Sequence, residues 1–152
     1  MIFKQNSLLI LFFFLSCNII KHDIQKTKES IILLKRTPCF GTCPVYEIKI
    51  FSNGEGIYNG YKFVKNIGEK KFKLSTLQIN KILDYAKKID FENLESEYSA
   101  SISDLSTTYI KINKKEIRDY VGAPIKLKKL ENMIDSIYLE AISDSSFQKT
   151  NE

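Results

Sequence analysis

The chain has 152 residues, enough for one domain with a hydrophobic core and too few for two. With three Cys and a single His, His22 near the N-terminus, it cannot form a dense disulfide framework or a His-based catalytic arrangement inside the domain. The net charge of +5 comes almost entirely from Lys. Because Lys groups of this kind are more often solvated faces than binding patches, we expect no nucleic-acid partner.

The first residues have the pattern of an export signal. Lys4 precedes an apolar run over 7–15, which is shorter than the roughly 20 apolar residues that a membrane-spanning helix needs. Cys17 follows Leu15-Ser16, a sequence that resembles the lipobox of bacterial lipoproteins, with Phe14 where Leu is commonest. This resemblance implies a signal peptide over 1–16 and a lipidated Cys17. The alternative is an ordinary cleaved signal in which Cys17 is incidental.

The remaining chain divides into a tether, a domain and a tail. Residues 18–29 are polar without periodicity, so we predict a flexible tether over 17–29 that begins at the lipidated cysteine. A single domain is predicted over 30–143, and a disordered tail over 144–152. Because Asn18 is not acidic, we expect a lipid-anchored location in the cell envelope, at the outer membrane facing the periplasm. The predicted membrane contact is the lipid anchor.

The first half of the domain has the periodicity of strands. An apolar run over 31–34 predicts a buried strand, and alternation over 45–51 predicts a strand with one wet face. Asn53-Gly54 favours a type I′ hairpin turn. Further strands are predicted over 56–61, with a bulge at Gly60, and over 69–74.

The second half adds two helices. Ser75 and Gln78 form a capping-box pattern at the start of a helix whose apolar face includes Ile79, Ile82 and Ala86. A loop over 99–106 precedes strands at 107–112 and 116–121. A final helix begins at Pro124. The order β-β-β-β-α-β-β-α predicts an α+β fold, a mostly antiparallel sheet with two helices packed on one face.

Cys39 and Cys43 lie four residues apart between two prolines. A disulfide is possible if the loop turns sharply enough to bring the α-carbons within about 7 Å, and Gly41 permits such a turn. A disulfide that closes so small a loop would add about 2 kcal/mol to the free energy of unfolding. The alternatives are thiol exchange and copper binding, because C-x3-C-P also resembles the motif of Sco-type copper chaperones. Pro44 here leads into a strand and the domain has no His, so we predict a structural disulfide, no metal and no cofactor.

Six short segments carry a family resemblance. Residues 36–46 contain Cys-Phe-Gly-Thr-Cys-Pro, residues 104–108 read Asp-Leu-Ser-Thr-Thr, and residues 119–124 read Asp-Tyr-Val-Gly-Ala-Pro. The other three are the Asn53-Gly54 hairpin, Leu130-Glu131 and Ile134-Asp135. The stretch over 30–140 resembles an uncharacterised bacterial domain with a C-F-G-T-C-P signature, which is found in lipoproteins and exported proteins. The resemblance implies no activity. Ser106 stands where the family has Pro, which should loosen the approach to the strand at Thr107.

Two groups of residues are candidate sites. The polar candidates are Asp104, Arg118, Asp119 and Tyr120. They could instead have structural roles, with Asp104 bonding the backbone of its own loop, Asp119 pairing with a Lys across the strands and Tyr120 packing its ring. Tyr58 and Tyr61 alternate with Lys and could stack on glycan rings from one sheet face, although core packing and an ordinary wet face explain them more simply.

These observations favour a non-catalytic envelope domain. We expect no enzyme activity, and we expect the domain to bind or support an envelope component, a protein or a glycan. One alternative is a thiol-redox or copper-handling protein that uses Cys39 and Cys43. The other is a glycan- or peptidoglycan-binding module.

Overall fold

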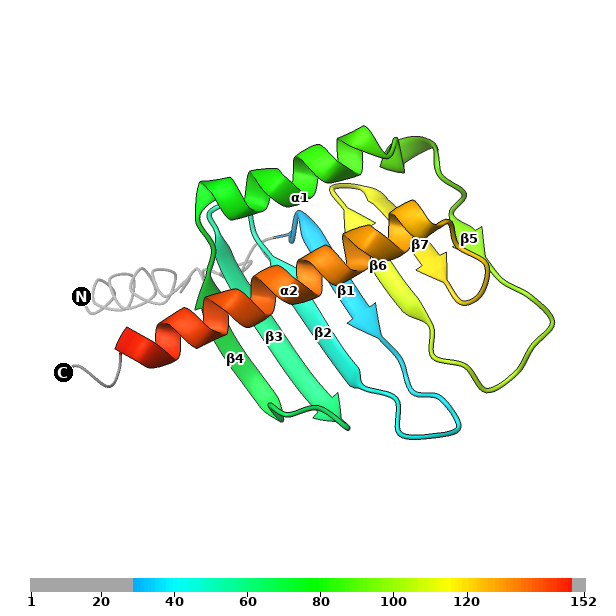
Figure 1. The fold of residues 1–152 in the computed structure, drawn as a ribbon, viewed down its shortest axis with the longest axis horizontal. Helices are drawn as coiled ribbons and strands as arrows, with labels where there is room; N and C mark the ends of the chain where they lie inside the picture. Colours follow the sequence, from blue (N-terminus) through cyan, green and yellow to red (C-terminus); the bar gives the residue numbers. More distant parts are fainter. Residues whose placement is uncertain (1–28, 149–152) are drawn as a thin grey trace, which may run out of the picture.

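The computed structural model describes residues 29–148, which form one sheet and two long helices (Figure 1). The strands are β1 (Ile32–Arg36), β2 (Val45–Ile50), β3 (Glu55–Lys62), β4 (Gly68–Lys73), β5 (Glu97–Tyr98), β6 (Thr108–Ile112) and β7 (Lys115–Asp119). The helices are α1 (Thr76–Lys88), the short 3₁₀-helix η1 (Phe91–Asn93) and α2 (Ile125–Gln148).

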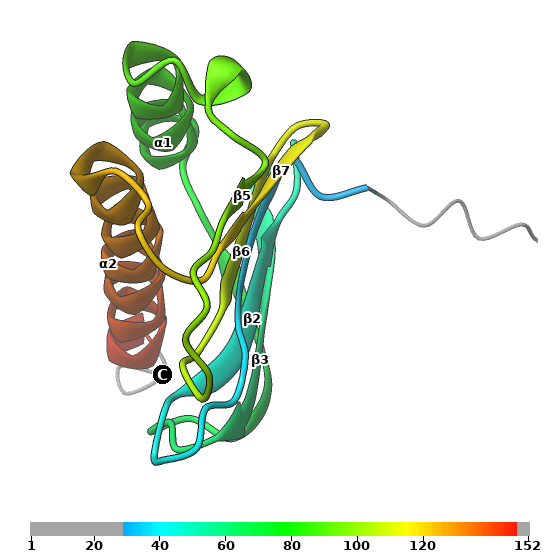
Figure 2. The same cartoon turned by 90° about the vertical axis from the view of Figure 1, so that its right-hand side faces the viewer.

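The predicted α+β fold is confirmed. The strand order is β4-β3-β2-β1-β6-β7-β5, and every neighbouring pair is antiparallel except β5 with β7. Both long helices lie on the same face of this sheet (Figure 2). The two-residue strand β5 lies just before the predicted 99–106 loop and was not expected, because it is too short to show a period.

Helix α2 continues further than the sequence suggested. It ends at Gln148, so residues 144–148 are helical, although we predicted them as part of a disordered tail. Residues 1–28 and 149–152, which include the predicted signal peptide, Cys17 and nearly all of the tether, lie outside the described residues. No helix within 29–148 is both long and apolar enough to cross a membrane.

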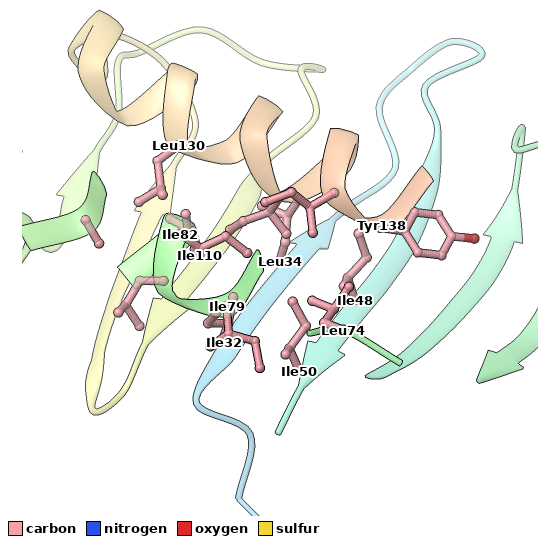
Figure 3. Packing of buried hydrophobic residues seen from close by; sticks show 14 of the residues in the cluster. Ile32, Leu34, Ile48, Ile50, Leu74, Ile79, Ile82, Ile110, Leu130 and Tyr138 are labelled. Atoms are coloured by element: carbon pink, nitrogen blue, oxygen red, sulfur yellow. The ribbon is translucent and has the colours of Figure 1, made fainter. Parts of the chain in front are cut away.

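Alternation along the central strands builds the core. Ile32 and Leu34 on β1 are fully buried, and so are Ile48 and Ile50 on β2, because these positions face the helices. Helix α2 packs Leu130 and Ile134 on the same face, and α1 adds Ile82 (Figure 3). One apolar layer between sheet and helices therefore holds the domain together.

The start of α1 carries the predicted capping box. The Gln78 amide donates to Ser75 Oγ at 3.2 Å, and the Ser75 amide donates to Gln78 Oε1 at 2.9 Å. The two side chains therefore satisfy two backbone donors that the helix start leaves without partners.

We expect Ser75→Ala to lower the free energy of unfolding by about 1 kcal/mol, because the first turn loses an acceptor. Urea unfolding followed by circular dichroism measures the change. Ser101→Ala, at an exposed loop position, is the control and should leave the unfolding midpoint unchanged. Equal midpoints for both variants would show that the box contributes nothing.

Strand β3 carries glycine at two inward positions, Gly56 and Gly60, on either side of Tyr58. The Phe72 ring lies over Gly56, where a Cβ would be only 2.2 Å from it. The predicted bulge at Gly60 is confirmed, since Tyr46 pairs with Gly60 but Val45 pairs with Lys62. Because glycine has no side chain, two aromatic rings can lie flat against the sheet at these positions.

The β2–β3 turn differs from the predicted type I′ hairpin. Gly54 has a φ of +83°, but Asn53 does not adopt a positive φ. The Gly54 amide donates to the Phe51 carbonyl, and the Phe51 amide donates to the Glu55 carbonyl, both at 2.9 Å. This is a longer turn in which only the last residue is left-handed, so the Asn-Gly pair marked the turn but not its type.

The strands give the sheet two different ends. The chain enters β1 beside the turns at 51–54 and 113–114, which form the end that we call the hairpin end. At the opposite end lie the segments 37–44, 63–67 and 99–107, which we call the loop end (Figure 1). Both ends matter for the site.

Candidate functional site

The segment 37–44 is closed by a disulfide between Cys39 and Cys43, as predicted, with the two α-carbons 5.8 Å apart. The Gly41 amide also donates to Cys39 Sγ at 3.3 Å. Phe40, between the cysteines, is 90% exposed. No group of three or more potential metal ligands exists among the residues that the structure describes.

Hydrogen bonds fasten this closed loop to the neighbouring segment 99–107. The Phe40 amide donates to the Asp104 carbonyl at 3.2 Å, and the Thr107 amide donates to Thr37 Oγ1 at 2.9 Å. Ser106 Oγ donates to the Thr37 carbonyl at 2.6 Å. The Ser106 hydroxyl therefore ties two loops together in a way that Pro could not.

The four predicted polar residues do not converge on one site. Asp119 points toward α2 and is buried, whereas its neighbour Arg118 lies on the opposite face and pairs with Glu97 at 2.6 Å. The Arg118 guanidinium also lies 5.4 Å from the Tyr120 ring centre. The Tyr120 hydroxyl donates to the backbone of Ile102 at 2.6 Å.

Asp104 has a role in its own loop. It adopts a left-handed conformation with a φ of +73°, and Ser103 Oγ donates to its carboxylate at 3.0 Å. Its carbonyl, as noted above, accepts from the loop that contains the disulfide. The structural alternative was therefore right in kind but wrong in two partners: Asp119 pairs with Lys128 of α2 and not with a Lys across the strands, and the Asp104 carboxylate accepts from the Ser103 side chain and not from the loop backbone.

A different polar network lies between the sheet and α2, centred on Arg36. Its guanidinium donates to Asp135 Oδ2 at 2.8 Å, to the Tyr46 hydroxyl at 2.7 Å and to Thr108 Oγ1 at 3.1 Å. The Tyr46 hydroxyl donates to Asp135 Oδ1 at 2.6 Å, which closes the ring of contacts. Burial acts to lower the pKa of Arg36, but the nearby Asp135 outweighs it and holds the pKa above its ordinary value.

Two buried carboxyl groups extend this network. Asp119 and Glu131 are each 1% exposed, and Lys128 forms an ion pair with Asp119. Lys128 and Arg36 both lie 3.7 Å from Glu131 Oε2. Burial and the adjacent Asp119 raise the pKa of Glu131, Lys128 and Arg36 act in the opposite direction, and the resulting pKa is about 7. Three acids share two cations here, so a proton on Glu131 balances the charge.

We expect the free energy of unfolding to fall between pH 5.5 and pH 8 by an amount on the order of 2 kcal/mol. The folded state holds the Glu131 proton up to about pH 7, whereas the unfolded chain releases it near 4.5. Stability from this proton is therefore complete below pH 4.5 and is lost as the pH rises through 7.

Urea titrations at several pH values measure this slope. Glu131→Gln keeps the side chain neutral and should flatten the slope, whereas Glu140→Gln, at an exposed position on the same helix, should not. The same slope in the wild type and in Glu131→Gln would mean that another group titrates.

A pocket of about 390 Å³ opens at the loop end, beside the Arg36 network. Aromatic and polar groups from β2, β3, the segment 63–67 and α2 form its walls, with Pro44 contributed by the disulfide loop. The lining residues are Pro44, Tyr46, Tyr58, Phe63, Val64, Lys65, Asn66, Asp135, Tyr138 and Leu139. Such a volume with mostly apolar walls is within the range of ligand sites.

The rim of this pocket contains a strained residue. Phe63 has a φ of +54°, a conformation that bulky side chains rarely adopt. Its ring is 47% exposed, and the Lys62 ammonium lies 4.8 Å from the ring centre. Backbone strain of this kind is found most often where a side chain must be held in a functional position.

Residues 30–138 match a domain of unknown function, DUF6438. The chain belongs to this family. A search of the curated proteins found no match to the chain. The family resemblance noted from the disulfide loop is thereby confirmed as far as an uncharacterised domain family.

The DUF6438 domain separates the two tyrosines that we proposed as one binding face. Tyr58 is 3% exposed and stacks on Tyr138, with ring centres 4.5 Å apart, whereas Tyr61 is 57% exposed. Tyr58 lines the pocket and Tyr61 does not. Burial raises the pKa of Tyr58 to about 12, and its hydroxyl donates to the Asn66 carbonyl at 3.2 Å.

We did not predict the centre of this network, namely Arg36, Glu131 and Asp135, as a site, although all three lie in segments that carry the family resemblance. Arg36 and Asp135 are 99 residues apart, and no local pattern links them. A signal for Glu131 did exist, because it falls on the same helical stripe as Leu127, Leu130 and Ile134. An acid on an apolar stripe indicates a buried partner.

Proposed function

We propose that this protein is a non-catalytic domain of the bacterial cell envelope, held to a membrane by lipid on Cys17, that binds another envelope component. The loop end provides the main support, because a formed pocket lies beside a loop stiffened by the Cys39–Cys43 disulfide. A preformed surface of this kind loses little conformational freedom on binding. The disulfide also suits an oxidising compartment outside the cytoplasm.

Metabolic labelling with an alkyne fatty acid, followed by membrane fractionation, tests the anchor. We expect the full chain to carry label and to sediment with membranes, and Cys17→Ala to lose both. Cys39→Ala, with Cys43→Ala in the same chain, is the matched control and should keep the label. Unlabelled protein in the cytosolic fraction with both domain thiols free would refute the proposal.

A thiol-redox function is the second candidate. Cys39 and Cys43 are only half-buried, within an exposed loop, so a reducing partner could reach their sulfurs. Titration of free thiols in protein isolated under acid trapping separates the two functions. A fully oxidised pair supports the structural role, whereas a mixed population that responds to the cell's redox state supports the redox role.

A further inference from the structure

The exposed apolar side chains are unevenly distributed over the domain. Nine large ones are exposed among residues 29–143, and six of these lie in or beside the three segments of the loop end. These six are Phe40, Tyr61, Phe63, Ile67, Ile102 and Leu105. The turns at 51–54 and 113–114 of the hairpin end contribute none of the nine. Leu77, which is one of the nine, lies near the start of α1, after the end of β4. Clustered apolar side chains of this kind mark interaction sites in soluble domains.

This surface is also rigid. The disulfide closes the loop that carries Phe40, and backbone hydrogen bonds join that loop to the segment that carries Ile102 and Leu105. The third segment packs its Asn66 carbonyl against the Tyr58 hydroxyl. Energetically dominant contacts in protein interfaces are typically such pre-positioned aromatic groups beside a pocket.

We propose that the loop end is the docking surface for a partner protein, which inserts an apolar side chain into the pocket between Pro44, Phe63 and Leu139. Lys65 lines this pocket, and the Lys62 ammonium lies 4.8 Å from the ring centre of Phe63, which also lines it, so we expect acidic residues to flank the inserted side chain. The polar rim around an apolar centre has the anatomy of a specific interface.

The position of the chain start favours a protein over the anchoring membrane, and this step rests on the proposed function. The chain enters β1 at the hairpin end, where the Asn113 amide donates to the Ile31 carbonyl at 2.7 Å. A lipid on Cys17 therefore pulls on the end opposite the pocket. Figure 2 shows the loop end at the other end of the sheet from the start of β1, a position that leaves it accessible to other envelope proteins.

Site-specific photocrosslinking in the full chain, expressed in its own host, tests the docking surface. A benzoyl-phenylalanine at position 40 should give one protein adduct, and the crosslinked peptide identified by mass spectrometry should contain an apolar residue beside Asp or Glu. The same probe at position 77 is the control, because Leu77 is 80% exposed and follows the hairpin end. It should give no such adduct.

Charge reversal tests whether acidic residues flank the side chain that the partner inserts. Lys62→Glu with Lys65→Glu should lower the adduct yield at position 40 at least threefold, whereas Lys70→Glu with Lys71→Glu on strand β4 should leave it unchanged. Equal losses of adduct from both pairs of substitutions would refute the expectation that acidic residues of the partner lie beside Lys62 and Lys65.

Adducts at position 40 that consist of lipid, glycan or a second copy of this chain would overturn the proposal of a partner protein, and so would equal yields at positions 40 and 77. Fatty-acid labelling of Cys17 in the same cells keeps the two proposals separate. Labelled protein without a specific adduct refutes the docking surface alone, whereas unlabelled cytosolic protein refutes the envelope function.

Discussion

Gly60→Ala is expected to lower the free energy of unfolding by about 3 kcal/mol, although it adds only one methyl group. An ideal Cβ at this position would lie 1.9 Å from the Asn66 carbonyl oxygen and 2.7 Å from the Tyr58 hydroxyl oxygen. The first contact is with backbone, which no rotamer change can relieve. The segment 63–67 would have to move, and the hydrogen bond between Tyr58 and Asn66 would be lost.

Urea unfolding followed by tyrosine fluorescence and circular dichroism measures this change. Gly41→Ala is the matched control, because a Cβ there would lie at an ordinary 3.8 Å from Cys39 Sγ. We expect this control to shift the unfolding midpoint little. A Gly60→Ala variant as stable as Gly41→Ala would show that the pocket wall adapts easily.

Arg36→Met is expected to lower the free energy of unfolding by about 3 kcal/mol. The substitution keeps most of the side-chain volume but removes the only group that bridges Asp135, Tyr46 and Thr108. Asp135 loses its ion pair, and Glu131, which is 1% exposed, loses a nearby cation. Removing one partner of a partly buried charge pair is costly because the desolvation of the other is left uncompensated.

Arg118→Met provides the matched control, since Arg36 and Arg118 are the only two Arg residues in the chain. Arg118 pairs with Glu97 on the exposed face of the sheet, so its loss should leave the unfolding midpoint essentially unchanged. Thermal unfolding by calorimetry compares the two variants. Similar unfolding temperatures for both would mean that the Arg36 network adds no net stability.

Much of the fold could be predicted because its determinants are local. Alternation over 45–51 identified a strand, and Ser75 with Gln78 marked the first turn of α1. The bulge at Gly60 could also be predicted, since an isolated glycine inside a strand pattern points to one. The end of α2 and the two-residue β5 could not, because their formation depends on packing against distant elements.

The site was harder to predict for the same physical reason. Sequence spacing suggested that Asp119 and Arg118 act together, yet adjacent strand residues point to opposite faces of a sheet. Lys128 on α2 pairs with the buried Asp119 at the end of β7, a contact that local spacing does not indicate. The residues that line the pocket come from four separate segments, and only the folded chain brings them together.

The position of β1 has a mechanical consequence. This strand lies in the middle of the sheet, pairs with β2 on one side and β6 on the other, and leads directly into the disulfide loop. If the anchor and the partner pull on its two ends, the load runs along the strand axis. The hydrogen bonds to β2 and β6 would then be sheared together rather than unzipped one at a time, and the domain could transmit tension between two envelope structures without unravelling.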